Sequence, residues 1–285
     1  MSARLLEGRA IAEAIRTKLK AQIGSVASSI VRPPKLVAVQ IGEDASSAVY
    51  LRSQTKTAEA LGIGYELRTL PETIAQPEAD LLVEALNNDP TVDAVILQLP
   101  VPKQIDAKRL IGLIMPQKDA EGMHPSNIGR IVLGTWTIAP CTASACMALI
   151  ETSGVDLYGK EAVVVGHSEI VGKPLAMMLL NAFATTTVCH IATGERGLLA
   201  EHVKRAEVLV SAVGKPGLIK GAWVKEGAVV IDVGINKVGD RIVGDVEFDE
   251  AARRASCITP VPGGVGPVTV TMLMKNVVEA WKEKR

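Results

Sequence analysis

The sequence predicts an α/β protein with two domains. Two series of short apolar strands alternate with amphipathic helices, and the irregular segment 115–142 lies between them. The second series opens with AVVVGHSEIVGKP at residues 162–174, which predicts a buried strand, a glycine turn and a helix opened by Pro174. Such a unit points backbone N–H groups at a phosphate. Its Gly-x5-Gly spacing differs from GxGxxG, so an ordinary βα turn stays open as the alternative.

Composition limits the class of protein. The 285 residues are 48% hydrophobic and 22% charged, which suits a globular chain with a sizeable core. Lys plus Arg and Asp plus Glu each number 31, so the formal net charge is +0. No basic excess points to a nucleic acid or to an anionic membrane. Aromatic residues are only 3%, which argues against a base-stacking surface.

The cysteines and the N-terminus indicate the compartment. Cys141, Cys146, Cys189 and Cys257 form no CxxC pair, so we expect free thiols in a reducing compartment and no metal site. The N-terminus carries charges within its apolar pattern, unlike a signal peptide, and no apolar run has membrane-spanning length. We therefore expect a soluble, cytoplasmic protein.

The first domain is expected to cover residues 1–139. Apolar residues at helical spacing over 11–23 predict a helix, and KLVAVQI at 35–41 predicts a strand that ends at Gly42. Possible N-caps precede a helix that ends at Gly62; they are Asp44, Ser46 and Ser47.

The remaining elements of this domain continue the alternation. Strands are expected at 65–70 and 92–99, the second ended by prolines, and helices at 77–88 and 106–114. The βαβαβ order predicts a parallel sheet. Segment 115–142 is expected to be irregular and functional, and 143–152 to form a connecting helix.

The second domain is expected to cover residues 140–267. Its further strands are predicted at 186–191, 207–213 and 228–233. The other expected elements are a helix at 198–205, a β-excursion at 237–246, a helix at 248–255, a rigid Pro/Gly loop at 259–269 and a last helix at 269–281. The C-terminal segment 268–285 is expected to pack back on the first domain.

Ligands of parallel sheets bind beyond the carboxyl ends of the strands. Two facing rims of this kind would form a cleft for a cofactor and a substrate. In the first domain the rule selects 42–50, 98–102 and the irregular segment with Asp119 and Glu121. Plainer interpretations stay open, since Tyr50 could be core, Gln98 could satisfy the backbone and Glu121 could be solvated. In the second domain the rule selects 166–172, 190–193, 213–216 and 234–236.

Several stretches together resemble one family. They are ILQLPVP at 96–102, VVVGHSEIVGKP at 163–174, IDVGIN at 231–236, VGDV at 243–246 and TPVPGGVGPVT at 259–269. In this order they closely resemble the methylenetetrahydrofolate dehydrogenase/methenyltetrahydrofolate cyclohydrolase family of the FolD type, over essentially the whole chain.

The resemblance implies a folate-binding catalytic domain, a Rossmann-type nicotinamide-binding domain, an active site in the cleft between them, and a homodimer. The implied reaction oxidises 5,10-methylenetetrahydrofolate to the methenyl form, which is then hydrolysed to 10-formyltetrahydrofolate. The residues implied on the folate side are Tyr50, Gln98, Glu121, Pro262, Gly263 and Gly264. Those implied on the cofactor side are Gly166, His167, Ser168, Ile191 and Ile235.

The chain departs from the family at its catalytic lysine. The family pattern is Tyr-x-x-x-Lys, and Gln54 stands at the lysine position. Lys56 does not replace it, because two residues along a helix turn a side chain by about 200°. A glutamine amide does not titrate near neutral pH, so it cannot move the proton that hydrolysis requires. The sequence therefore predicts a dehydrogenase with weak or absent cyclohydrolase activity.

Two alternatives stay open. The chain could be the complete bifunctional enzyme, with Gln54 and Glu121 acting together through a water, or a non-catalytic paralogue that binds folate or nucleotide. A second departure bears on folate, because Glu121 replaces the aspartate of the family's Lys-Asp-x-Asp-Gly pattern. The side chain is one methylene longer, which puts the affinity or pose of the folate in question.

The third departure concerns the cofactor. The family default is NADP, and NAD stays open as the alternative. His167 stands where many relatives have arginine, and Ile191 offers nothing to a 2′-phosphate. A histidine can meet a phosphate when protonated, and Arg196 could also reach the site.

Overall fold

The computed structural model describes residues 2–27, 32–42 and 47–283. The expected N-caps Asp44 and Ser46 lie outside these ranges, and the side chain of Ser47 is also outside the description. The chain divides into two compact units. Unit 1 comprises Met1–Glu13 and Thr142–Thr269, and unit 2 comprises Ala14–Cys141 and Val270–Arg285. The expected domain limits at 139/140 and 267/268 stay a prediction.

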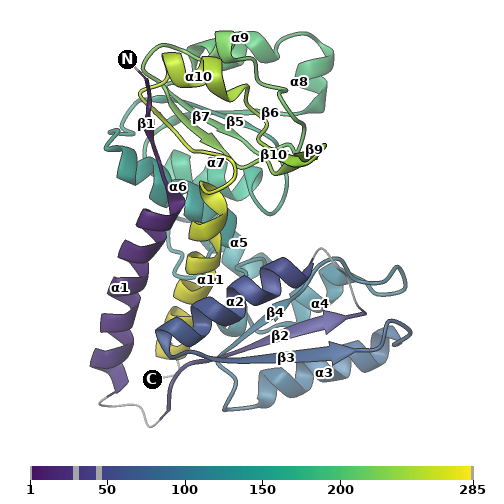
Figure 1. The fold of residues 1–285 in the computed structure, drawn as a ribbon. Coiled ribbons are helices and arrows are strands. Elements are labelled where there is room, and N and C mark those ends of the chain that lie inside the picture. The colour runs from purple at the N-terminus through teal and green to yellow at the C-terminus, as the bar shows by residue number, and fades with distance from the viewer. Residues whose placement is uncertain (1, 28–31, 43–46, 284–285) are drawn as a thin grey trace. The chain divides into compact units, whose positions relative to one another are not determined.

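Unit 2 contains a parallel three-stranded sheet in the order β3-β2-β4 (Figure 1). The strands are β2 (Lys35–Ile41), β3 (Gly64–Leu70) and β4 (Ala94–Leu97). The helices between and after them are α2 (Ser47–Leu61), α3 (Gln76–Asn88) and α4 (Ala107–Leu113). The predicted βαβαβ order and parallel sheet are confirmed, although β4 is shorter than the expected strand 92–99.

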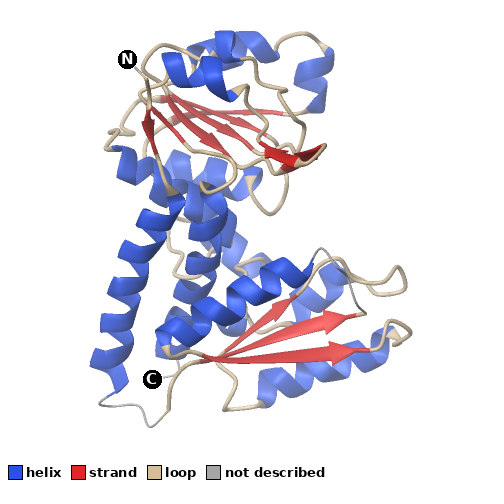
Figure 2. Ribbon diagram, viewed as in Figure 1, coloured by secondary structure: helices blue, strands red, loops and turns tan. Residues whose placement is uncertain are grey.

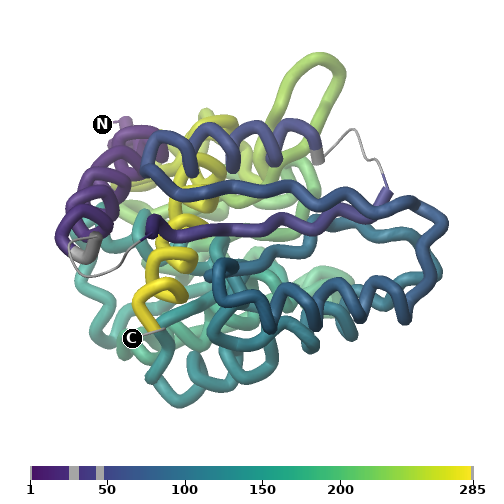
Figure 3. Tube along the Cα trace, turned by 90° about the horizontal axis from the view of Figure 1, so that it is seen from below, coloured from purple at the N-terminus to yellow at the C-terminus, as the bar shows by residue number. Residues whose placement is uncertain are grey.

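The sheet of unit 2 is covered on both faces. Val37, Val39 and Ile41 of β2 pack with α3 and α4 in one core cluster. The alternate residues Leu36 and Ala38 are also buried, and Figure 3 shows α2 and α3 on opposite sides of the strands. A strand covered on both faces is apolar at successive positions, which explains why KLVAVQI does not alternate with polar residues.

The expected irregular segment 115–142 was partly wrong. It holds a short 3-10 helix η1 (Pro116–Lys118) and the helix α5 (Pro125–Val132). The imidazole of His124 accepts a hydrogen bond from the backbone N–H of Ser126 at 3.0 Å, and Pro125 occupies the first helical position. Proline is well suited to that position because its missing N–H has no partner there in any helix. The following α6 (Cys141–Ser153) contains the expected connecting helix.

Unit 1 contains a six-stranded sheet in the order β1-β11-β8-β7-β5-β6, with every neighbouring pair parallel. Figure 2 shows its strands in red. Its strands are β1 (Arg4–Leu5), β5 (Glu161–Val165), β6 (Thr185–Cys189), β7 (Val208–Ser211), β8 (Val229–Asp232) and β11 (Cys257–Ile258). The helices around it include α7 (Gly172–Asn181), α8 (Ile191–Glu195), α9 (Leu199–Arg205) and α10 (Phe248–Arg254), with the 3-10 helix η2 (Gly221–Trp223).

The two-residue strands β1 and β11 were not predicted, because two residues carry no periodicity. β1 pairs with β11, and the backbone N–H of Leu6 donates to the carbonyl of Ile258 at 2.9 Å. This pairing explains why the first 13 residues cluster with unit 1.

Other elements are confirmed but begin or end at residues that differ from the predicted ones. The β-excursion is confirmed as the antiparallel pair β9 (Asn236–Val238) and β10 (Arg241–Val243). The N-terminal helix α1 spans Gly8–Ala27, and the last helix α11 spans Val265–Lys282. α11 therefore begins inside the stretch 259–269 that was expected to be a loop. The two-domain α/β fold class is confirmed, and within the described ranges no helix is both long and apolar enough to cross a membrane.

Candidate active site

Helix α2 places Tyr50 and Gln54 on one face, four residues apart. They differ in exposure, because Tyr50 is 44% exposed whereas Gln54 is 2% exposed. Tyr50 is thus not a core residue, and its ring is available to a ligand. Lys56 is exposed, as its position on the helix predicts.

The buried amide of Gln54 contacts residues from the two strands on either side of β2. Gln98 follows β4 directly, is 7% exposed, and donates from Nε2 to Oε1 of Gln54 at 3.1 Å. The hydroxyl of Tyr65 on β3 donates to the same oxygen at 2.9 Å. Burial raises the pKa of Tyr65 to about 12, although a hydrogen bond with Thr55 opposes the shift. Gln54 is therefore a neutral group whose carbonyl is held by two donors.

Glu121 lies in a loop that docks beside β4. The backbone N–H of Ala120 donates to the carbonyl of Val95 at 3.0 Å, and Asp119 forms a parallel bridge with Val95. Burial raises the pKa of Glu121 to about 8, and the negative charge of Asp119 adds to the rise. Glu121 is itself half-buried, unlike a freely solvated surface carboxylate.

Asp119 organises this loop. Its Oδ1 accepts from the backbone N–H of Gly122 at 3.0 Å, and its Oδ2 accepts from that of His124 at 2.7 Å and from Nδ2 of Asn127 at 3.0 Å. Burial raises the pKa of Asp119 in spite of these bonds. Because its oxygens are occupied by the loop, Asp119 is a structural residue and Glu121 is the carboxyl group left for a ligand.

Electrostatic coupling links Tyr50, Glu121 and Cys141. Desolvation raises the pKa of Tyr50, and ionisation of Glu121 or Cys141 raises it further. Burial raises the pKa of the Cys141 thiol well above its usual range, with Glu121 and Asp119 adding to the effect. Cys141 is thus a buried neutral thiol, not a nucleophile.

Asn276 of α11 fixes the Glu121 loop from the other side. Its Nδ2 donates to the carbonyl of Ala120 at 2.8 Å and to that of Ala139 at 2.9 Å. Gly122 has φ +77, and a Cβ there would lie 2.2 Å from the carbonyl carbon of Ala139. The two segments are in such close contact that only glycine fits. Neither Asn276 nor Tyr65 was selected from the sequence, because each lies far along the chain from the residues that it contacts.

In unit 1, the turn between β5 and α7 has the close backbone packing expected of a phosphate loop. Gly166 has φ +121, and a Cβ on Gly172 would lie 2.0 Å from the carbonyl oxygen of Gly166. The hydroxyl of Ser168 accepts from the backbone N–H groups of Val171 at 3.2 Å and Gly172 at 3.4 Å. The helix begins at Gly172, two residues before the expected Pro174.

His167 and His190 lie together at the ends of β5 and β6. Their ring centroids are 5.4 Å apart in an edge-to-face arrangement, and both residues are exposed. Ile191 is 75% exposed and begins α8, so the expected strand 186–191 ends earlier, at Cys189. The neighbouring imidazoles are two groups on this rim that can meet an anion.

Two buried acids explain the IDVGIN and VGDV motifs. Oδ1 of Asp232 accepts from the backbone N–H groups of Gly234 and Asp245, both at 3.0 Å. Asp245 accepts from Lys215 N at 2.8 Å and from Nδ2 of Asn236 at 3.0 Å. Burial raises the pKa of Asp232 to about 6. The acids hold the loops after β7 and β8 and leave Ile235 63% exposed on the rim.

Family models match nearly the whole chain. Residues 6–121 match the catalytic domain of tetrahydrofolate dehydrogenase/cyclohydrolase, and residues 140–285 match its NAD(P)-binding domain. The chain belongs to this family. The family resemblance and the nicotinamide cofactor class are therefore confirmed.

Named relatives of this family are similar over their full length. The bifunctional protein FolD of Geotalea uraniireducens is 49% identical over 283 residues, covering 99% of this chain and 100% of the relative. That of Moorella thermoacetica is 47% identical, covering 98% and 99%.

Solved structures of this family are also similar to the chain over its full length. The FolD enzyme of Campylobacter jejuni has a TM-score of 0.95 and 39% identity, covering 100% of both chains. The Trypanosoma brucei enzyme, complexed with NADP cofactor and inhibitor, has a TM-score of 0.94 and 40% identity, covering 100% of this chain and 99% of that one.

The residues predicted from the family fall in separate units. Tyr50, Gln54, Gln98 and Glu121 belong to unit 2 and to the stretch matched by the catalytic domain. Unit 1 carries the cofactor-side residues and also the segment 262–264, which follows β11 and directly precedes α11.

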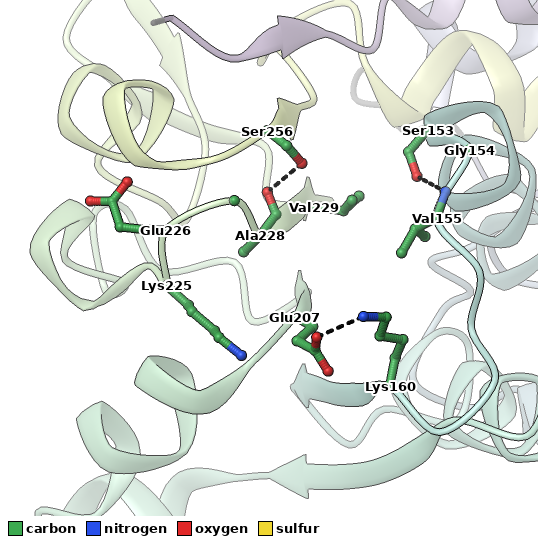
Figure 4. Close-up of a pocket in the computed structure, with 11 residues that line it drawn as sticks. Ser153, Gly154, Val155, Lys160, Glu207, Lys225, Glu226, Ala228, Val229 and Ser256 are labelled. Carbon is green, nitrogen blue, oxygen red and sulfur yellow. Dashed lines mark hydrogen bonds and ion pairs between the residues drawn. The ribbon is translucent and has the colours of Figure 1, made fainter.

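A separate cavity of about 280 Å³ lies at the amino ends of β5, β7 and β8, whereas the cofactor-side residues follow the carboxyl ends of the unit 1 strands (Figure 4). Of its charged side chains, Lys160 pairs with Glu207 at 2.9 Å and Glu226 with Arg254 at 3.1 Å. None of the predicted site residues lines it. The cavity is thus distinct from the family's cofactor rim.

Proposed function

We propose that the chain oxidises 5,10-methylenetetrahydrofolate to 5,10-methenyltetrahydrofolate by hydride transfer to NADP⁺, with weak or absent cyclohydrolase activity. The named relatives, bifunctional FolD proteins, support the dehydrogenase reaction. The observation that carries the second half is the buried Gln54 at the position of the family's lysine, with its carbonyl oxygen occupied by Tyr65 and Gln98.

Hydride transfer requires little acid–base catalysis from the protein. The methylene carbon is already activated by two nitrogens, so the protein has to orient it against the nicotinamide and favour the developing cation. Tyr50 offers an exposed aromatic face, and Gln98 and Glu121 offer polar groups for the pterin. The nicotinamide cofactor supplies the hydride acceptor when bound, and the turn Gly166, His167, Ser168 with Ile191 and Ile235 forms the proposed cofactor rim.

Hydrolysis, in contrast, requires acid–base catalysis. Water must be activated and a proton moved while a C–N bond breaks. Gln54 cannot take or release that proton, and Lys56 is exposed on another face of α2. The loss of the lysine therefore affects the second reaction far more than the first.

The experiment follows absorbance of the methenyl product. Wild-type enzyme given methylenetetrahydrofolate and NADP⁺ should accumulate the methenyl form, whose decay should stay at the buffer rate. Gln54→Lys should raise hydrolysis at least about 10-fold, because it restores a titratable amine at the site. Ser53→Lys, at an exposed position on the same helix, is the matched control. Rapid hydrolysis by the wild type, lost in Gln54→Ala, would refute the proposal.

The complete bifunctional enzyme is the second candidate, and one observation favours it. Glu121, with a pKa of about 8, could exchange a proton near neutral pH. In that case wild-type hydrolysis would be substantial and Glu121→Gln would abolish it. A non-catalytic paralogue would show no folate-dependent reduction of NADP⁺ or NAD⁺ at all.

For the cofactor we propose NADP, with NAD as the alternative. The neighbouring imidazoles of His167 and His190 support an interaction with a 2′-phosphate, and residues 189–193 at the end of β6 include no acid for a ribose hydroxyl. Comparing kcat/KM for NADP⁺ and NAD⁺ decides between them. A ratio that favours NAD⁺ would contradict the assignment.

A cytoplasmic homodimer completes the proposal. All four cysteines are buried free thiols, which suits a reducing compartment. β6 is an edge strand of the unit 1 sheet, and exposed apolar residues lie near it. Phe183 is 70% exposed, Tyr158 is 74% exposed and their rings are 5.7 Å apart, while Leu180 is 57% exposed. Exposed edges and apolar patches are typical of surfaces that associate.

A further inference from the structure

The side-chain amide of Gln54 is held by hydrogen bonds at its carbonyl oxygen. Its Oε1 accepts hydrogen bonds from Tyr65 and Gln98, at 2.9 and 3.1 Å. An amide oxygen has two lone pairs, so both are used. Among the described residues no hydrogen-bond partner is found for Nε2 of Gln54. The planar amide group therefore directs its two N–H donors away from the sheet.

We propose that Tyr65 is a positioning residue that keeps Gln54 in this orientation, with its carbonyl toward the sheet and its N–H donors toward the folate. The inference rests on the proposed function, because it takes the α2 face bearing Tyr50 and Gln54 as the folate side. In place of the family's cation, the site then offers a neutral, oriented hydrogen-bond donor.

The strand that carries Tyr65 makes it a firm support. β3 pairs with β2 over seven residues, and Tyr65 lies opposite Leu36, which is fully buried. The ring is itself half-buried, so its hydroxyl has little freedom. The hydroxyl stays protonated, since its pKa is about 12, and donates throughout the working pH range.

Gln98 alone would hold the amide less well. If the Gln54 amide turned over by itself, its N–H₂ group would face the N–H₂ group of Gln98, and two donors would be left against each other. The hydroxyl of Tyr65 can both donate and accept, so it adds no such penalty. Its hydrogen bond from a different strand instead fixes the position of the amide, at 2.9 Å from the carbonyl oxygen. The substitution Tyr65→Phe removes this hydroxyl and keeps the aromatic ring.

The test uses Tyr65→Phe in the full-length enzyme. We expect the KM for methylenetetrahydrofolate to rise about 3- to 10-fold with kcat changed less than about 2-fold, because an oriented donor binds the folate equally in the ground and transition states. In a Gln54→Leu background the same substitution should leave KM unchanged. Tyr158→Phe removes a hydroxyl from an exposed tyrosine of unit 1 and is the matched control.

An unchanged KM in Tyr65→Phe, or an equal rise in both backgrounds, overturns the inference while the dehydrogenase assignment stands. A wild type without dehydrogenase activity refutes the proposed function instead. The side-chain amide signals of Gln54 in ¹⁵N NMR spectra, assigned by their absence from the spectra of Gln54→Leu, give a readout that does not depend on turnover. Tyr65→Phe should shift and broaden them, and signals identical to those of the wild type contradict the positioning role.

Discussion

At the scale of single residues, the candidate site of unit 2 is a hydrogen-bonded cluster around a neutral amide. Gln54, which the sequence resemblance aligns with the family's lysine, is buried among hydrogen-bond partners, whereas Tyr50 is open to a ligand. Burial and the negative charge of Asp119 raise the pKa of Glu121 to about 8. Glu121 is thus an acid of the described cluster whose pKa lies near neutral.

The pKa of Glu121 predicts a pH-dependent stability. Because the pKa rises from 4.5 to about 8 on folding, the favourable contribution of the protonated form is complete below pH 4.5 and is lost as the pH rises through 8. Glu121→Gln cannot ionise, so its Tm relative to the wild type should increase by several °C between pH 6 and pH 9, roughly 1 kcal/mol or more. Thermal melts with exposed Glu84→Gln as control measure this, and a constant difference would contradict it.

At the scale of elements, the proposed site residues lie where strands end. β5 ends at the glycine turn, β4 ends one residue before Gln98, and the loops after β7 and β8 are held by Asp232 and Asp245. The helix α11 holds a loop in the same way within unit 2, because Asn276 joins the carbonyls of Ala120 and Ala139. Buried polar groups thereby fix the loops that we propose bind ligands.

Asn276→Leu tests this role of α11. The substitution removes the amide donor from two carbonyl oxygens and leaves that of Ala120 only the weak thiol donor of Cys141, which should lower the free energy of unfolding by about 2–4 kcal/mol. It should also raise the KM for the folate, because the Glu121 loop loses its support. Urea unfolding and steady-state kinetics measure both effects. Asn88→Leu, at the exposed end of α3, should change neither by more than about 0.5 kcal/mol or 2-fold.

At the scale of the whole molecule, each structural unit is built from two separate stretches of the chain. Residues 1–13 belong with 142–269, and the C-terminal segment belongs with 14–141. β1 forms one edge of the unit 1 sheet and β6 the other. The edge at β6 is accompanied by exposed Phe183 and Leu180, so this is where we expect a second copy of the chain to bind.

Leu180→Lys should therefore shift the protein from dimer to monomer. A charge in the middle of an apolar contact is costly to bury, so the dissociation constant should increase by at least about 10-fold. Sedimentation equilibrium over a concentration series measures it. Leu81→Lys, at a similarly exposed position on α3 of unit 2, serves as control. A wild type that is monomeric at all concentrations would rule out the homodimer.

The sequence by itself determined the α/β class, the parallel order of the long strands, the family, and the residues Tyr50, Gln54, Gln98 and Glu121 as those to inspect. Periodicity and motifs are local signals, and the elements of seven or more residues in β2, β3 and α3 carry them clearly. Only the tertiary structure decided the partners of these residues. Tyr65 on β3 meets Gln54 on α2, and Asn276 meets Ala120 across 156 positions of sequence. The pKa of Glu121 likewise depends on burial and on Asp119, because desolvation and hydrogen bonding arise from three-dimensional packing, which no local pattern in the chain records.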